Sequence, residues 1–200
     1  MTKEHWNERF GQEAFVYGKE PNAFIREKAP LLPQGNVLAI AEGEGRNAVY
    51  LASLGHTITT WDYSMAGLEK TKTLAAEKGV HVETKWVDLQ EAPWEKDAWD
   101  HITCVFGHFD HDLRINTLRQ IEQAVKTGGS FLCEVYSTEQ LHYKTGGPRD
   151  INMLYRPEEF LATFSNWQIK HFFVGEVERQ EGSLHQGLSH VIQFYGVKRG

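Results

Sequence analysis

Short apolar runs alternate with amphipathic stretches along most of the chain. Residues 37–41 form one apolar run, and residues 48–54 place apolar side chains at the three- and four-residue spacing of a helix. The segment EGEGRN at 42–47 lies between them and contains two glycines. This pattern predicts a strand, a glycine turn and a helix, which is the unit that holds a nucleotide-like cofactor against a helix N-terminus.

The alternation of strand and helix patterns continues to residue 136. Ser64 is placed to cap a helix that Gly79 ends, and Gly128-Gly129 is expected to end a later helix. The expected strands cover 57–62, 80–87, 100–106 and 130–136, and the expected helices cover 65–78 and 112–126. Strands and helices that alternate at these lengths imply a mainly parallel sheet with helices on both faces.

The last third of the chain changes character. Residues 137–156 contain Gly146-Gly147-Pro148 without clear periodicity, which predicts a loop over the carboxyl edge of the sheet and a candidate substrate loop. A short helix is expected from Pro157 to Phe164. Two long strands, 168–178 and 188–198, joined around Glu181-Gly182-Ser183, should be antiparallel neighbours. The expected fold is a Rossmann-like, doubly wound α/β sheet of about seven strands, mostly parallel with a C-terminal antiparallel hairpin, in a single domain spanning 1–200.

Aromatic residues lie among charges in the N-terminal segment, residues 1–35. Trp6 and Phe10 are four residues apart, which places them on one face of a short helix. These rings either pack on the core or belong to a flap, together with Tyr17, that closes over a ligand. The sequence leaves both interpretations open.

Composition narrows the class of protein. The chain has 200 residues and a net charge of −6, which argues against a nucleic acid or an anionic membrane as its main partner. Cys104 and Cys133 lie in apolar runs and are expected to be buried free thiols in a reducing compartment. With no signal-peptide pattern and no apolar run of ~20 residues, we expect a cytoplasmic protein. The oligomeric state stays open.

Acidic residues follow two of the expected strands. Asp62 comes 19 positions after Gly43, close to the spacing at which an acid meets a ribose. Asp88 either contacts adenine or caps a turn. The pattern of Gly43, Gly45 and Ala48 with Asp62 also satisfies a dinucleotide fingerprint, so an NAD(P)-dependent oxidoreductase is one alternative function. A non-catalytic, cofactor-binding regulatory protein is another.

Together, the glycine turn, the two acids and the closing hairpin resemble a class I S-adenosylmethionine-dependent methyltransferase. The segments GEGRNAVYLASLG (43–55) and TTWDYS (59–64) are similar to the tellurite-resistance and thiopurine-type small-molecule methyltransferases. The chain departs from that family at Ala39, where an acid is usual, and at Ala41, where glycine is frequent; an acid stands instead at Glu42. The resemblance implies S-adenosyl-L-methionine as the cofactor and a small molecule as the acceptor.

The resemblance also implies which residues form the cofactor site. They come from the N-terminal aromatic segment, the glycine turn and the ends of the second to fourth strands: Trp6, Phe10, Tyr17, Glu42, Gly43, Gly45, Arg46, Asn47, Asp62, Tyr63, Ser64, Asp88, Leu89 and Phe106. Arg46 either holds a carboxylate or an anionic substrate, or it is a solvated residue in the first helical turn.

Methyl transfer from a sulfonium has an activated leaving group, so a base is not obligatory and no catalytic residue is assigned. Candidates for contact with the acceptor follow the fourth and fifth strands, at the edge where ligands bind: His108, His111, His142 and Tyr155. The ten histidines show no metal-ligand spacing, and no metal is expected.

Overall fold

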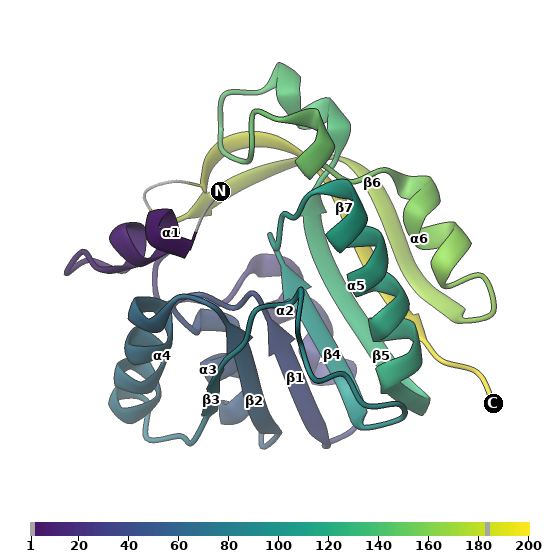
Figure 1. The fold of residues 1–200 in the computed structure, drawn as a ribbon, viewed down its shortest axis with the longest axis horizontal. Coiled ribbons are helices and arrows are strands. Elements are labelled where there is room, and N and C mark those ends of the chain that lie inside the picture. The colour runs from purple at the N-terminus through teal and green to yellow at the C-terminus, as the bar shows by residue number, and fades with distance from the viewer. Residues whose placement is uncertain (1–2, 183–184) are drawn as a thin grey trace.

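The computed structural model describes residues 3–182 and 185–200. Its centre is a seven-stranded sheet in the order β3-β2-β1-β4-β5-β7-β6 (Figure 1). The strands are β1 (Asn36–Ile40), β2 (Thr57–Asp62), β3 (Glu83–Trp86), β4 (Trp99–Val105), β5 (Val125–Tyr136), β6 (Gln168–Glu181) and β7 (His185–Val197). β1 to β5 run parallel, whereas β7 is antiparallel to both β5 and the edge strand β6. The predicted doubly wound sheet with a C-terminal antiparallel hairpin is confirmed.

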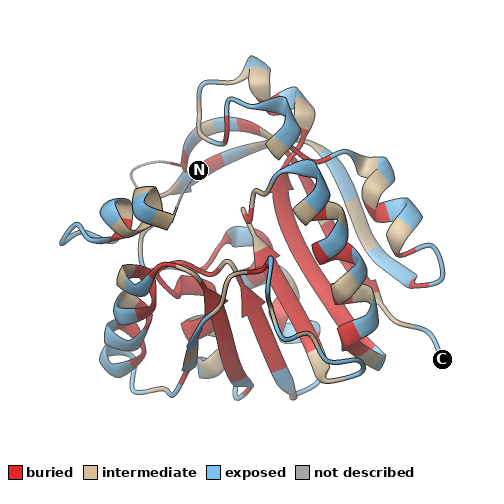
Figure 2. Ribbon diagram, viewed as in Figure 1, coloured by how far each residue is buried: buried red, intermediate tan, exposed pale blue. Residues whose placement is uncertain are grey.

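Helices cover both faces of the sheet. One apolar cluster includes residues of α2 (Ala23–Lys28), α3 (Arg46–Ser53) and α4 (Met65–Glu77). The other includes residues of α5 (His111–Ala124) and α6 (Pro157–Thr163). Figure 2 shows the central strands as the most continuously buried part of the molecule. The remaining elements are α1 (Lys3–Phe10) and the 3₁₀ turns η1 (Ala29–Leu31), η2 (Thr138–His142) and η3 (Ile151–Met153).

Local sequence signals place β2 and α4 where they were expected. Ser64 caps α4 by accepting a hydrogen bond from the Gly67 amide at 3.2 Å. Gly79 follows the helix in a left-handed conformation (φ +67°), as glycine commonly does at a helix C-terminus. The segment from 57 to 79 therefore follows the sequence prediction closely.

Three boundaries differ from the sequence predictions. β3 covers only 83–86 rather than 80–87. β4 ends at Val105 because Phe106 turns to a left-handed conformation (φ +54°). Gly128-Gly129 does not end α5 but lies inside β5, which starts at Val125. A Cβ on Gly129 would lie 2.4 Å from the carbonyl oxygen of Asp100, so glycine permits a close approach to β4 where the strand register shifts.

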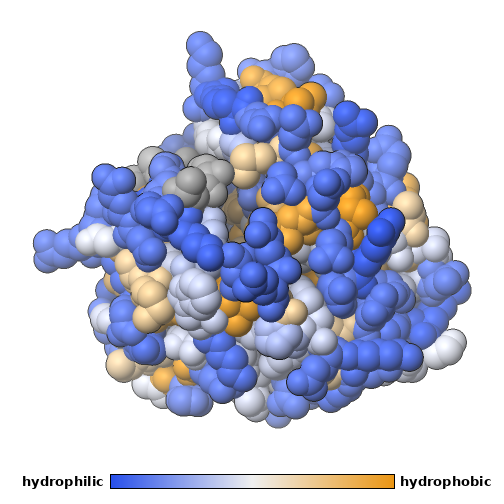
Figure 3. Space-filling model, viewed as in Figure 1, coloured by the Kyte–Doolittle hydropathy of each residue, from blue (hydrophilic) through white to orange (hydrophobic). Residues whose placement is uncertain are grey.

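The hairpin strands are longer than predicted, and β6 and β7 arch over the carboxyl edge of the sheet toward α1 (Figure 1). Their connection at residues 183 and 184, including the expected turn residue Ser183, lies outside the described residues. On the face drawn in Figure 3, hydrophilic residues predominate and apolar residues form separate small patches. Within the described residues, no helix is long and apolar enough to cross a membrane.

Candidate active site

A cleft lies at the carboxyl ends of β1, β2 and β4 and consists of two adjoining cavities of about 390 and 580 Å³. The smaller one lies between the glycine turn and the β6–β7 hairpin, and we call it the hairpin-side cavity. The larger one lies beside Asp62 and Asp88, and we call it the β3-side cavity. Ala41, His108 and Met153 line both, so the two cavities form one continuous cleft.

The glycine turn between β1 and α3 forms the floor of this cleft. Gly43 and Gly45 both have positive φ, +62° and +84°. A Cβ on Gly43 would lie 2.9 Å from the Phe10 ring, and one on Gly45 would lie 2.5 Å from the Thr71 side chain. The turn therefore requires glycine for its backbone conformation and for its close packing on α1 and α4.

Asp62 fixes the turn from the end of β2. Its two carboxylate oxygens accept hydrogen bonds from the backbone amides of Gly43 at 2.8 Å and Ser64 at 2.7 Å. Burial raises the pKa of Asp62 to about 6, and the backbone amides oppose that rise. The carboxylate lines the β3-side cavity and is mainly ionised at neutral pH.

Glu42 caps α3 from inside the cleft. The N-cap residue Gly45 has no side chain to offer, and Glu42 Oε1 instead accepts from the amides of Asn47 and Ala48, each at 2.9 Å. Burial raises the pKa of Glu42 to about 7. The acid that stands at 42 rather than 39 thus completes a helix N-terminus and lines the hairpin-side cavity.

Two further side chains of this segment hold the N-terminal part of the chain. Glu44 accepts from the amides of Val16 and Tyr17, each at 3.2 Å, and pairs with Lys70 at 2.8 Å. Arg46 is buried, pairs with Glu181 at 2.7 Å and donates to the Tyr17 carbonyl at 3.2 Å. Residues 16–17 are therefore fixed to the glycine turn.

One side of the hairpin-side cavity is a continuous series of rings, the aromatic wall. In order of contact its members are Trp6, Phe10, Tyr17, His185, Phe106, Tyr136 and His108, with successive centroids 4.6–6.2 Å apart. They come from α1, the following loop, the ends of β4 and β5, and the start of β7. The fold thus gathers rings from distant parts of the sequence.

Two histidines in the wall are neutral at physiological pH. His108 donates from Nδ1 to the Met153 carbonyl at 3.0 Å, and its Nε2 accepts from the Tyr136 amide at 3.4 Å. Burial lowers the pKa of His108 to about 4. Burial, with Arg46 and Arg179 nearby, lowers the pKa of His185 to about 2, and its Nδ1 has no hydrogen-bond partner among the described residues.

The other residues expected at the cofactor site lie on both sides of the floor. Tyr63, Asp88 and Leu89 line the β3-side cavity, and Asp88 pairs with Lys3 at 2.7 Å, which lowers its pKa. Asn47 lines the hairpin-side cavity. Ser64 is buried as the cap of α4 and is not part of the lining.

Only His108 of the four candidate acceptor contacts lines the described cleft. His111 and His142 have side chains 63% and 78% exposed, on the outer surface. Tyr155 is buried in the core, where its hydroxyl donates to the Gly107 carbonyl at 2.8 Å. Among the described residues there is also no group of three or more His, Cys, Asp or Glu arranged to hold a metal ion.

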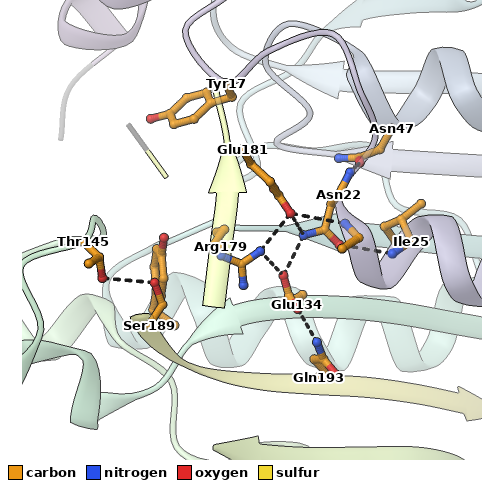
Figure 4. A network of polar contacts seen from close by, with 12 residues as sticks. Tyr17, Asn22, Ile25, Asn47, Glu134, Thr145, Arg179, Glu181, Ser189 and Gln193 are labelled. Atoms are coloured by element: carbon orange, nitrogen blue, oxygen red, sulfur yellow. Dashed lines mark hydrogen bonds and ion pairs between the residues drawn. The ribbon is translucent and has the colours of Figure 1, made fainter. Parts of the chain in front are cut away.

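A buried ion network lies behind the wall and was not anticipated from the sequence (Figure 4). Arg179 pairs with Glu134 at 2.9 Å and Glu181 at 3.0 Å. Asn22 donates to Glu134 at 2.6 Å and to Glu181 at 3.2 Å. The network ties the hairpin to α2 and β5. The site predicted from the sequence also left out three lining residues: Tyr136 at the end of β5, Arg149 in the loop that follows η2, and His185 at the start of β7.

Known proteins with related sequences point to one family. Residues 37–129 match the family described as "Methyltransferase domain". The "Probable S-adenosyl-L-methionine-dependent methyltransferase TehB" of Haemophilus influenzae is 23% identical over 168 residues, which is 81% of this chain and 54% of that protein. The "Ubiquinone/menaquinone biosynthesis C-methyltransferase UbiE" of Geotalea daltonii is 28% identical over 120 residues, 58% of this chain and 51% of that one. The chain spans about half the length of these curated relatives.

A solved structure shares the overall fold. The crystal structure of TehB from Haemophilus influenzae superposes with a TM-score of 0.75 at 15% identity, covering 98% of this chain and 67% of that one. S-adenosyl-L-methionine is the cofactor that the family and fold imply. With the family match over residues 37–129, which include the glycine turn, and with the shared fold, the chain resembles the class I S-adenosylmethionine-dependent methyltransferases, TehB among them.

Proposed function

We propose that this protein transfers a methyl group from S-adenosyl-L-methionine to a small-molecule acceptor in the cytoplasm, and that residues 1–200 form one domain for this reaction. The observation that carries the proposal is the hairpin-side cavity, about 390 Å³ and enclosed by the aromatic wall above the glycine turn. Cavities of this size take small molecules. The buried, unpaired thiols of Cys104 and Cys133 are typical of a reducing compartment.

The residues of the cleft fit the cofactor. Asp62 offers a buried carboxylate at the end of β2, where a ribose would be held, with Tyr63, Asp88 and Leu89 beside it for the base. Aromatic side chains line the cavity, and the face of an aromatic ring attracts a positively charged sulfonium. These features favour the methyltransferase over the nicotinamide-dependent alternative. In this proposal residues 1–35 form the flap and 137–156 form the acceptor loop.

The cofactor supplies a methyl group already activated on a sulfonium sulfur. The protein contributes by positioning and by excluding water. Both nitrogens of His108 are engaged within the protein, and the pKa values of His108 and His185 lie far below 7, so neither imidazole takes a proton from an acceptor at neutral pH. With neither histidine acting as the base, the acceptor in this proposal attacks in a form that needs no deprotonation by them, as a thiolate, neutral amine or oxyanion.

Titration calorimetry with S-adenosylhomocysteine and with NADH tests the cofactor. We expect S-adenosylhomocysteine to bind and NADH not to bind, and the reverse result would support the oxidoreductase instead. A second assay supplies S-adenosylmethionine with a labelled methyl group and 2-mercaptoethanol, butylamine, phenol or selenite. We expect label on at least one of them, with a rate that follows the ionisation of the acceptor itself. Cofactor binding with no label transferred to any small acceptor would favour a regulatory protein.

A further inference from the structure

Three arginines line the hairpin-side cavity, although the chain has a net charge of −6. Arg9 and Arg149 both line it. Arg46 and Arg179 are close enough to oppose protonation of His185, and Arg9 does the same. Four arginines therefore lie at or close to this one cavity.

The carboxylates that line this cavity are occupied by other partners. Glu44 pairs with Lys70 and accepts two backbone amides. Glu42 accepts two amides at the start of α3. Asp150 accepts from the Asn152 amide at 2.9 Å, within its own turn. Among the described residues, none of these side chains forms an ion pair with an arginine that lines the cavity.

Arg9 and Arg149, in contrast, have no carboxylate within ion-pair distance anywhere in residues 3–182 and 185–200. Arg9 donates to the Tyr17 hydroxyl at 2.9 Å and lies over the Trp6 ring. Arg149 donates to the Tyr143 carbonyl at 3.0 Å. Both guanidinium groups therefore keep their full charge beside the cavity.

The loop that carries Arg149 is braced in position. Gly147, just before Pro148, packs so closely on Tyr136 that a Cβ would lie 2.8 Å from the ring, and its φ is +81°. Gln140 donates to the Gly146 carbonyl at 3.2 Å and accepts from the His190 amide at 2.7 Å. The loop is thus held to both β5 and β7, and it presents Arg149 at the edge of the cavity.

The charges of the cofactor can be compared with those of Arg9 and Arg149. The cofactor brings one carboxylate, which can neutralise one arginine, together with a sulfonium and an ammonium that are both positive. Set against Arg9 and Arg149, this leaves three positive charges without a counter-ion: one arginine, the sulfonium and the ammonium. We propose that the acceptor is an organic acid whose carboxylate, remote from the atom that is methylated, is bound by Arg149. This inference rests on the proposed function and names its substrate class.

Matched probes test the proposal. The affinities of 3-mercaptopropionate and its neutral analogue 3-mercaptopropionamide are measured by calorimetry on the protein saturated with S-adenosylhomocysteine. We expect the carboxylate to bind the unmodified protein at least about tenfold more tightly. Arg149→Gln should remove that preference and leave the amide affinity unchanged. Arg119→Gln, which removes the same charge from the exposed side of α5, should preserve it.

Equal affinity of the two probes for the unmodified protein would overturn the proposal, and so would a preference that survives in Arg149→Gln. Selenite is titrated in parallel: binding of selenite that depends on Arg149, without such dependence for mercaptopropionate, would assign the site to an inorganic oxyanion and overturn the organic acid. Failure of the proposed function shows separately, as absent S-adenosylhomocysteine binding. In that case the same probes are titrated into the ligand-free protein.

Discussion

The floor and the wall of the cleft are built in different ways. The floor is the glycine turn with Glu42, Gly43, Gly45 and Asp62, and its main hydrogen bonds join carboxylates to backbone amides. The wall is a series of rings that contact one another through their side chains. The floor depends on the conformation of one short segment, whereas the wall depends on how distant elements are brought together.

This difference determines how each part responds to change. A backbone-built floor tolerates almost no added atoms, because a Cβ would meet neighbouring side chains and force a strained conformation. A side-chain-built wall can accept different rings if the elements behind it stay in place. We therefore expect the floor to determine cofactor binding, and the wall and its adjoining loop to determine which acceptor binds.

The largest effect should follow from Gly45→Ala. The new Cβ would lie 2.5 Å from the Thr71 side chain, and the alanine would have to adopt a φ of +84°. We expect a loss of roughly 2–4 kcal/mol in the free energy of unfolding and no measurable binding of S-adenosylhomocysteine. Gly79→Ala is the matched control, because φ there is +67° and no atom lies within 4 Å. Urea denaturation measures the free energy of unfolding of both variants. Gly79→Ala shows the effect of backbone strain alone, so an equal loss of stability in Gly45→Ala would contradict close packing of the floor.

A smaller effect is expected for Asp62→Asn. The amide can no longer accept through both terminal atoms, so the amide of Gly43 or Ser64 loses its partner. We expect binding of S-adenosylhomocysteine to weaken by about 1–3 kcal/mol. Asp88→Asn, at the end of the next strand, removes a partly exposed pair with Lys3 and should cost less. Calorimetry measures the affinity of both variants for S-adenosylhomocysteine. An equal loss of affinity in Asp62→Asn and Asp88→Asn would contradict a specific role for Asp62 in holding the glycine turn.

A third effect concerns the pH dependence of stability, which should have opposite signs for the floor and the wall. The folded-state pKa of Glu42 is raised to about 7, so its contribution to stability is present at low pH and is lost as pH rises from about 4.5 to 7. The pKa of His185 is lowered by burial, so its contribution is present above about pH 6.5 and is lost as pH falls.

Glu42→Gln should therefore gain stability relative to the unmodified protein as pH rises, by up to about 3 kcal/mol for a shift of this size. His185→Gln should lose stability over the same interval. Chemical denaturation at pH 4.5, 5.5, 6.5 and 7.5 measures both differences. Parallel trends for the two variants would remove the contrast between floor and wall.

Much of the fold could be predicted because its signals are local. The β-branched run 57–62, the Ser64 cap and the Gly79 stop each act within a few residues, and β2 and α4 lie where they indicate. The failures concern neighbours that are distant in sequence. Gly128-Gly129 has the composition of a helix stop, yet the backbone of β4 beside it decides that it belongs to β5.

The residues of the candidate site also divide into those that local sequence patterns could predict and those that depend on distant parts of the chain. The floor residues follow one another in the chain, so spacing could place Asp62 beside Gly43. The pairing of Arg46 with Glu181 and the position of His185 beside Tyr17 depend on the arch of the hairpin, which no local pattern encodes. Arg149 lies in a segment without periodicity, so only the three-dimensional structure could place it at the cavity.

The place of β7 between β5 and β6 has a consequence for synthesis on the ribosome. The floor is complete once the first four strands have emerged, whereas β6 has β7 as its neighbour in the sheet and cannot join before it. A nascent chain that has released β6 but not β7 carries a long strand without a partner in the sheet. We therefore expect this interval, rather than assembly of the glycine turn, to be when the growing protein is most exposed to aggregation and most in need of a chaperone.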